Sequence, residues 1–355
     1  GSAAGCTVRR MKTYNAYGTV AASDESEPPH SVSGALPERE YRYDNLKAFL
    51  IFCVVLGHVL KRFGMSEGAD ALYLLIFSFH MPAFLFVSGY FAKYNPKRVL
   101  GKLLPLYLVF QCVQFLLDPL MMVPDQGWQV LGEIHFQLFT PRWTLWYLMA
   151  LMIYQLLLPL FEAHSRVQAG RCLAVAAALG LFIGCNPDTD NFMALARVFH
   201  FLPIFLLGYY ERRWHLLSGL GGTRPALRRA AAIFLAAALC AGLILFHWAL
   251  PASWFYGTES YGTDGFSWLA RLGVWLLALV WIWIFLVLAP GRRLAVLESV
   301  GRNTLPVYLL HTVVLIGLSA TMLPVWLGGN LPALVVLALL ITYVLSRDCF
   351  ARAVN

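Results

Sequence analysis

Residues 43–58 read YDNLKAFLIFCVVLGH, an apolar run with a basic residue near its start and a histidine at its end. Lys47 and His58 are eleven positions apart. At 100° per residue, this spacing brings both to one helix face, within about 20°. At 1.5 Å per residue they are about 16 Å apart along the axis. If this helix crosses a bilayer, Lys47 lies at one water boundary and His58 lies past the midplane on the same wall.

Nine similar apolar runs follow, and a bilayer core requires about 20 mostly apolar residues in a helix. Of the 355 residues, 59% are hydrophobic and only 13% are charged, whereas a soluble domain is about 25% charged. We therefore expect an all-α polytopic membrane protein, a bundle of about ten transmembrane helices. The predicted spans are residues 46–63, 70–92, 100–123, 143–161, 169–185, 193–210, 228–248, 267–289, 303–323 and 331–346.

Lysine and arginine gather in alternate segments between these runs. Cytoplasmic loops carry the excess of basic residues in membrane proteins, and with the amino terminus inside, most of the 27 lysines and arginines fall in inside segments. We predict an N-in/C-in topology, in which the net charge of +8 requires no nucleic-acid partner. The exceptions to this pattern are Lys61, Arg62 and Arg142 in outside loops, and Arg197 and Arg271 within spans.

The amino-terminal part of the chain differs from the rest. Residues 1–40 are rich in Ser, Pro, Gly, Glu and Ala and contain no apolar run, which is typical of disordered segments. We expect a disordered cytoplasmic tail over residues 1–40 and a ten-helix membrane domain over residues 41–355. The seven cysteines are scattered without ligand spacing, so neither a disulfide framework nor a metal site is predicted.

Ionisable side chains at membrane depth indicate function, because burial in an apolar environment costs free energy. Five of the nine histidines lie in predicted spans. His247, beside Trp248 at a span end, needs no explanation beyond an interfacial position. His58 is the main catalytic candidate. A snorkelling anchor at Lys47 and a helix-packing histidine would explain the same spacing.

Two further spans carry polar candidates. His80 lies in FSFHMPAFLFVSGYF, where Pro82 interrupts the helix, and a broken helix at membrane depth faces protein or a water-filled cavity. The alternative is an ordinary proline kink with a satisfied histidine. Arg197 and His200 are three positions apart on one helix face, which suits a substrate or acid–base role at the outer mouth. The remaining candidates for substrate contact or for support of the site are Asp44, Asn303 and His311.

Together these segments resemble the acyltransferase-3 family of integral membrane O-acyltransferases, in its fucose 4-O-acetylase-like and polysaccharide-modifying branch. The resemblance covers about residues 40–350. The family's first-span signature is a basic residue, ten intervening residues and a catalytic histidine, so the resemblance assigns catalysis to His58. The family usually has Arg where this chain has Lys47, which keeps the charge but not the two-pronged grip on phosphate. The resemblance rests on YDNLKAFLIFCVVLGH, FSFHMPAFLFVSGYF, NPKRVLGKLLPLY, WTLWYLMALMIY, FHFLPIFLLGYYERR and SVGRNTLPVYLLH, in this order.

The resemblance also implies a reaction and its partners. An acyl group, acetyl first and succinyl next, would move from cytoplasmic acyl-CoA to a hydroxyl of an extracytoplasmic carbohydrate, with Lys47, Arg98 and Lys102 binding the donor. Acyl-CoA, expected to be acetyl-CoA, is then a co-substrate, and no permanently bound cofactor is expected. The expected location is the bacterial cytoplasmic membrane, with the lipid bilayer around a bundle that acts without a further domain. Direct transfer and an acyl-histidine relay both stay open.

A secondary transporter or exporter of polysaccharide or lipid-linked sugar is the alternative, with the same histidines and arginines as proton or substrate sites. Transporters often contain internal repeats with broken helices at matching positions. The helix with His80 and Pro82 has no counterpart half a chain later. A scaffold for protein partners is a third possibility, against which the buried ionisable residues argue.

Overall fold

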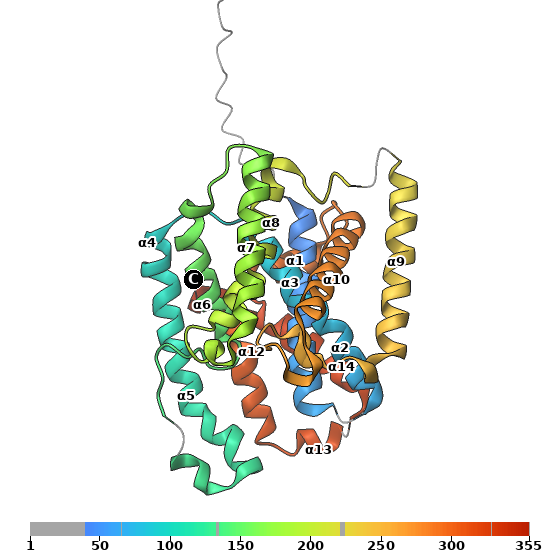
Figure 1. The fold of residues 1–355 in the computed structure, drawn as a ribbon. Coiled ribbons are helices and arrows are strands. Elements are labelled where there is room, and N and C mark those ends of the chain that lie inside the picture. Colours follow the sequence, from blue (N-terminus) through green and yellow to red (C-terminus); the bar gives the residue numbers. More distant parts are fainter. Residues whose placement is uncertain (1–39, 65, 133–134, 221–223, 328, 355) are drawn as a thin grey trace, which may run out of the picture. The chain divides into compact units, whose positions relative to one another are not determined.

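The computed structural model describes residues 40–354, with gaps at residues 65, 133–134, 221–223 and 328. The predicted disordered tail therefore lies, apart from residue 40, outside the described residues. Within them the chain forms helices and no β-strand, as the ribbon in Figure 1 shows. The all-α class predicted from composition is confirmed.

The helices are named in chain order. They are α1 (Tyr41–Phe63), α2 (Glu67–Phe77), α3 (His80–Tyr90), α4 (Pro96–Arg98), α5 (Leu104–Gln126), α6 (Trp146–Leu157), α7 (Arg166–Phe182), α8 (Leu195–Trp214), α9 (Pro225–Leu245), α10 (Trp268–Leu288), α11 (Ala295–Arg302), α12 (Thr304–Ser319), α13 (Leu323–Leu327), α14 (Leu331–Leu345) and α15 (Asp348–Val354). A π-helix, η1 (Val99–Leu103), joins α4 to α5. The 3-10 segments are η2 (Trp128–Gly132), η3 (Trp143–Leu145), η4 (Leu158–Phe161), η5 (Ile183–Cys185), η6 (Pro187–Asn191), η7 (His247–Ala249), η8 (Ala252–Phe255) and η9 (Thr263–Gly265).

Every predicted span falls on helical structure, but not every span reaches full length. Helices α12 and α14 are apolar and shorter than a membrane is thick, while α1 and α8 are long and carry charged residues. The multi-pass membrane class is supported, and the count of ten spans and the N-in/C-in orientation stay predictions. In the described part of the chain, six helical stretches are long and apolar enough to cross a membrane: Glu67–Tyr90, Pro96–Leu120, Trp143–Phe161, Arg166–Cys185, Pro225–Leu245 and Trp268–Leu288.

The second predicted span is broken where Pro82 indicates a break. Helix α2 ends at Phe77 and α3 begins at His80. Proline has no N–H and its ring clashes with the carbonyl one turn earlier, so the regular ladder cannot continue through this point. The Ser78 hydroxyl donates to the Leu75 carbonyl oxygen at 2.7 Å and satisfies part of the interrupted backbone. The break leaves His80 in the first turn of a new helix.

Helices α3 and α8 pack with their backbones in close contact (Figure 1). A Cβ at Gly89 would overlap the carbonyl oxygen of Phe205, and a Cβ at Gly208 would overlap that of Phe86. Small residues allow such approach between membrane helices. This contact sets the distance between the elements that carry His80 and Arg197.

We expect Gly208→Ala to lower the free energy of unfolding by about 1–3 kcal/mol, because the added methyl meets backbone atoms that cannot move aside. The matched control is Gly242→Ala in α9, where a Cβ would meet nothing within 4 Å. Thermal unfolding of detergent-purified protein, followed by tryptophan fluorescence, compares the two. Equal Tm values for both variants would show that the α3–α8 contact is not tight.

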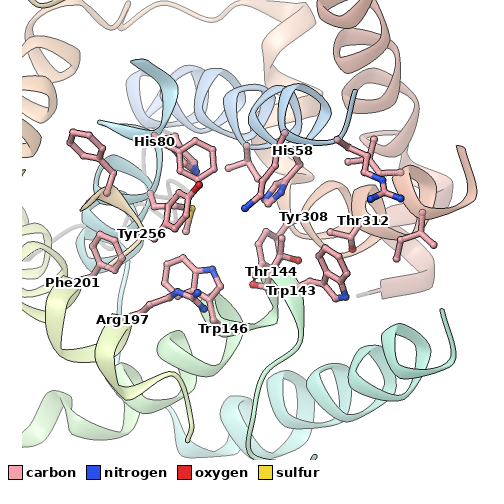
Figure 2. Close-up of a pocket in the computed structure, with 18 residues that line it drawn as sticks. His58, His80, Trp143, Thr144, Trp146, Arg197, Phe201, Tyr256, Tyr308 and Thr312 are labelled. Carbon is pink, nitrogen blue, oxygen red and sulfur yellow. Dashed lines mark hydrogen bonds between the residues drawn. The ribbon is translucent and has the colours of Figure 1, made fainter. Parts of the chain in front are cut away.

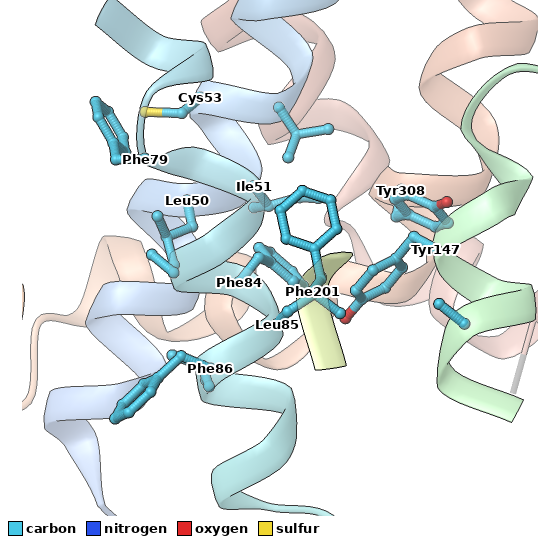
Figure 3. Packing of buried hydrophobic residues seen from close by; sticks show 14 of the residues in the cluster. Leu50, Ile51, Cys53, Phe79, Phe84, Leu85, Phe86, Tyr147, Phe201 and Tyr308 are labelled. Carbon is cyan, nitrogen blue, oxygen red and sulfur yellow. The ribbon is translucent and has the colours of Figure 1, made fainter. Parts of the chain in front are cut away.

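A packed apolar layer separates Lys47 from His58 along α1. Leu50 and Ile51 are fully buried and Val54 is nearly so, and all three lie between Lys47 and His58 on the same side of the helix. Figure 3 shows Leu50 and Ile51 packed among aromatic side chains of neighbouring helices. The two ends of the predicted site are therefore divided by core.

Candidate active site

A cavity of about 430 Å³ lies beyond this layer, towards the end of α1. Its wall combines the carboxyl-terminal half of α1 with the α2–α3 break, η3 and α6, α8, α12 and the segment after η8. The volume falls within the range of about 300–1,000 Å³ that is typical of small-molecule sites. Imidazoles, hydroxyls, indoles and three basic side chains line it.

His58 reaches into this cavity from α1, as Figure 2 shows. Val54, His58 and Arg62 follow one another at four-residue steps, so one face of α1 forms the wall. The Arg62 Nε donates to the Ser319 hydroxyl at 2.8 Å and ties the end of α1 to the end of α12. The predicted catalytic histidine therefore faces an internal space rather than lipid.

His80 and His311 are held alike, each by a carbonyl oxygen one turn earlier in the chain. The His80 Nδ1 lies 2.9 Å from the Ile76 oxygen, and the His311 Nδ1 lies 3.0 Å from the Val307 oxygen. A carbonyl oxygen only accepts hydrogen bonds, so Nδ1 carries the hydrogen in both rings. In the neutral ring, Nε2 is then left as an acceptor.

His311 lies directly behind His58. Their ring centroids are 5.2 Å apart and the rings are tilted by 43°. His311 is fully buried, and its Nε2 has no hydrogen-bond partner among the described residues. A buried acceptor without a partner is costly. The His58 ring lies closer to the His311 ring than the Tyr308 ring does, whose centroid is 6.2 Å away. Two candidates that are 253 positions apart in the chain thus form a pair.

The opposite wall carries a cation and aromatic rings. The Arg197 guanidinium lies 5.4 Å from the centre of the Trp146 ring, and Figure 2 shows both across the cavity from His58. On the α1 side, the Lys61 Nζ lies 5.0 Å from the centre of the Tyr256 ring, whose hydroxyl is 2.6 Å from that of Tyr73. Such rings hold cations by attraction to their faces.

The segment that carries Tyr256 is fixed by a buried arginine. Arg271 is 1% exposed. Its guanidinium donates to the Gly180 carbonyl oxygen at 2.5 Å and to the Glu259 carbonyl oxygen at 2.6 Å. Burial and the nearby Asp264 carboxylate raise the pKa of the Glu259 side chain in this loop. Arg271 therefore supports the loop and does not line the cavity.

The predicted donor residues lie away from the cavity. Lys47 pairs with Asp44 at 2.8 Å and lies 5.3 Å from the centre of the Phe91 ring. Phe91 ends α3 and leads into the basic segment, where the Asn95 side chain caps the helix by accepting from the Arg98 N–H at 2.9 Å. Arg98 is exposed and Lys102 is half-buried in η1. Phe91 therefore links Lys47, near the start of α1, to the chain segment that carries Arg98 and Lys102.

Like Asp44 and His311, the predicted residues His200 and Asn303 do not line the cavity. His200 is fully buried beside Trp275, whose indole donates to the His200 carbonyl oxygen at 3.0 Å. Asn303 donates to the Ser346 carbonyl oxygen at 2.8 Å and to the Asp348 carboxylate at 2.9 Å. Asn303 thus joins the start of α12 to the end of α14. The role that the structure shows for Asn303 is to hold these two helices together by hydrogen bonds.

Sequence reasoning placed Arg197 in the site, and Arg197 lines the cavity. It missed several other cavity residues, and one signal could have found two of them. Lys61 and Arg62 depart from the predicted inside location of basic residues, as Arg197 does, and both line the cavity. A positive charge on the wrong side of a membrane opposes the usual orientation preference. Thr144 and Thr312, which also line the cavity, show no such signal.

The fold and the site define a class: a multi-pass helical membrane protein whose bundle forms a cavity lined by histidine, aromatic and basic side chains. The acyltransferase domain of the acyltransferase 3 family matches residues 40–347, so the chain belongs to this family of membrane acyltransferases. Nodulation protein NolL of Sinorhizobium fredii is similar to it, with 27% identity over 199 residues. The aligned part spans 50% of this chain and 50% of that relative. No solved structure matches the chain.

Proposed function

We propose that this acyltransferase moves an acyl group, acetyl first and succinyl next, from cytoplasmic acyl-CoA to a hydroxyl of an extracytoplasmic carbohydrate. The bacterial cytoplasmic membrane is its proposed location. The observation that carries the proposal is the His58 imidazole, which faces an internal cavity with His311 behind it. The family supplies the acyl-transfer chemistry, and the cavity supplies a base beside a space large enough for the acceptor.

His58 would act as the general base. The acceptor hydroxyl loses its proton to His58 while its oxygen attacks the thioester carbonyl carbon. The carbon–sulfur bond then breaks, and the coenzyme A thiolate takes the proton back from the imidazolium. The products are an ester on the acceptor and free coenzyme A, and His58 returns to its neutral form. The direct route needs no covalent enzyme intermediate.

His311 would orient that base. Its Nδ1–H is held by the Val307 carbonyl oxygen, so its Nε2 can accept a hydrogen bond from the N–H of His58. This contact would leave the other His58 nitrogen with a lone pair directed at the acceptor hydroxyl. Hydrogen bonds between catalytic groups are often long before substrate binds, which is consistent with the ring separation of 5.2 Å.

The donor would bind at the Lys47 end. Lys47, Arg98 and Lys102 provide positive charge at a predicted water boundary, and charge-assisted contacts to phosphate are strong. The thioester must then reach His58, about 16 Å away along α1, past Leu50, Ile51 and Val54, which are buried. We infer that donor binding separates α1 from its neighbours along this layer.

The acceptor would enter from the opposite end of the cavity. Trp146 and Tyr256 contribute aromatic rings to the cavity wall, and Arg197 contributes a guanidinium. A few polar groups among aromatic walls are typical of small-molecule sites. This combination suits a sugar, which has both apolar ring faces and hydroxyl groups.

The test of the proposal is the release of coenzyme A. Detergent-purified protein supplied with acetyl-CoA should release free thiol, detected with a thiol reagent, and should do so faster when the cell-envelope carbohydrate of the host is added. A secondary transporter would instead release no thiol, and its activity in proteoliposomes would follow an ion gradient. Absence of thiol release from folded protein would contradict the enzyme.

We expect Arg98→Ala to raise the KM for acetyl-CoA about tenfold with little change in kcat, because a phosphate contact holds the donor equally in the ground state and the transition state. Lys102→Ala should act in the same direction. Arg171→Ala is the control, since Arg171 is also exposed but lies on α7. Steady-state thiol release measures all three, and an unchanged KM in the Arg98 variant would exclude this residue from donor binding.

A further inference from the structure

A second cavity adjoins the first. It has a volume of about 380 Å³ and lies between α5 and the segment that leads into α6. Trp143 lines both cavities. The polar residues of the second cavity are Asp118, His135, Gln137, Thr140 and Arg142.

One wall of this cavity is held in place by α5. The Gln111 amide is fully buried and donates to the carbonyl oxygens of Gln137 at 2.6 Å and Thr140 at 2.7 Å. Its oxygen accepts from the Arg142 N–H at 3.1 Å, and the Tyr107 hydroxyl donates to the Leu138 carbonyl oxygen at 2.7 Å. The segment is therefore fixed before any ligand arrives, which reduces the cost of binding.

Trp143 stands between the two cavities in a constrained conformation. Its φ of +49° lies in the left-handed region that tryptophan rarely adopts. The indole Nε1 donates to the Asp118 carboxylate at 3.0 Å, and Asp118 is 2% exposed and also pairs with Arg142. Strained residues persist where the surroundings hold them, and they concentrate at ligand sites. The indole thus has a fixed position at the boundary.

The chemistry of the second cavity suits a neutral, hydroxyl-rich ligand. Asp118 and Arg142 neutralise each other, so the lining does not select strongly for an anion or a cation. Gln137 and His135 add hydrogen-bonding groups and Trp143 adds an aromatic surface. A lipid chain would leave these polar groups unpaired at a cost in free energy, whereas a sugar unit would satisfy them.

We propose that this second cavity is a subsite for the sugar unit next to the one that is acylated, so that the acceptor is an oligosaccharide or polysaccharide chain lying across Trp143. The inference rests on the proposed function, because it assumes that the first cavity holds the acylated sugar. A chain that fills both cavities binds more tightly than its monosaccharide. The hydrogen bonds in the second cavity contribute only when the neighbouring unit is present.

The experiment compares one carbohydrate in two forms. Cell-envelope polysaccharide from a host strain that lacks this gene is used intact and after acid hydrolysis to monosaccharides, with acetyl-CoA as donor and full-length purified protein. The wild-type protein should show a lower KM for the intact polymer. In the double variant His135→Ala with Gln137→Ala, the KM for the polymer should rise about tenfold, and the KM for the hydrolysate should not change.

Controls separate the possible failures. His164→Ala removes an exposed histidine from the segment between η4 and α7 and should change neither KM. Thiol release without acceptor should be equal in all variants, because no donor residue is altered. Transfer with equal KM for both acceptors, or an equal rise for both in the double variant, would overturn the subsite alone. Thiol release that no carbohydrate accelerates would overturn the proposed function as well.

Discussion

The His58→Ala variant is expected to lose about 10²–10⁴-fold in the rate of acyl transfer while it stays folded. The reason is that the imidazole is the proposed base, and alanine leaves the acceptor hydroxyl with no group in that place to take its proton. Donor binding should be retained, since Lys47 lies near the other end of α1 and Arg98 lies in α4, and neither is altered. The loss should therefore fall on kcat rather than on the KM for acetyl-CoA.

Single-turnover transfer of radiolabelled acetyl from acetyl-CoA measures this effect directly. The control is His247→Ala, because His247 lies in η7, and its Nδ1 lies 2.8 Å from a local carbonyl oxygen, that of Ile244. Thermal unfolding in detergent confirms that both variants are folded. A folded His58→Ala protein with normal transfer would falsify the assignment of the base.

His311→Phe is expected to reduce transfer about 100-fold. Phenylalanine has a ring that fills a similar space but offers no acceptor to the His58 N–H, so the base loses its orientation. Residues that orient a catalytic histidine contribute strongly to rate. The loss of rate should be smaller than for His58→Ala. His311 is a neutral imidazole, so it orients His58 but does not stabilise the imidazolium that forms there as a carboxylate would.

His311→Gln separates orientation from packing. Its amide can donate to the Val307 carbonyl oxygen and accept from His58, as the native ring can, so part of the activity should return. The decisive readout is kcat at saturating acetyl-CoA for the Phe and Gln variants, with Tm measured for each. Equal losses in kcat for the two variants, at equal stability, would assign His311 to packing alone.

The class of protein and one wall of the site could be predicted from the amino-acid sequence. Apolar runs of membrane length and a low content of charge are sufficient for an all-helical membrane protein, and the family followed from ordered motifs. The spacing from Lys47 to His58 predicted a shared helix face, and Pro82 predicted the break before His80. These are local properties, because helical geometry relates residues that are close in sequence.

Other features of the site depend on contacts between helices, which the geometry of a single helix does not determine. The pairing of His58 with His311 requires α1 and α12 to be neighbours, and no periodicity in either helix states this. The layer of Leu50 and Ile51 between Lys47 and His58 was not anticipated, because an apolar side chain in a membrane span can face lipid, a cavity or core. Asn303 was placed among the polar candidates, and only its partners show that it joins α12 to α14.

Residue types and their order therefore establish that this chain is a helical membrane acyltransferase with a histidine in the carboxyl-terminal half of its first long helix. Only the packing of the helices decides that His58 contacts His311 and that Trp143 lines two cavities. Packing also decides that buried apolar side chains separate Lys47 from His58. The physical reason is that composition and helical period act within one element. The identity of a side chain's neighbours, in contrast, depends on close approaches such as that of Gly89 and Gly208, which join elements far apart in the sequence.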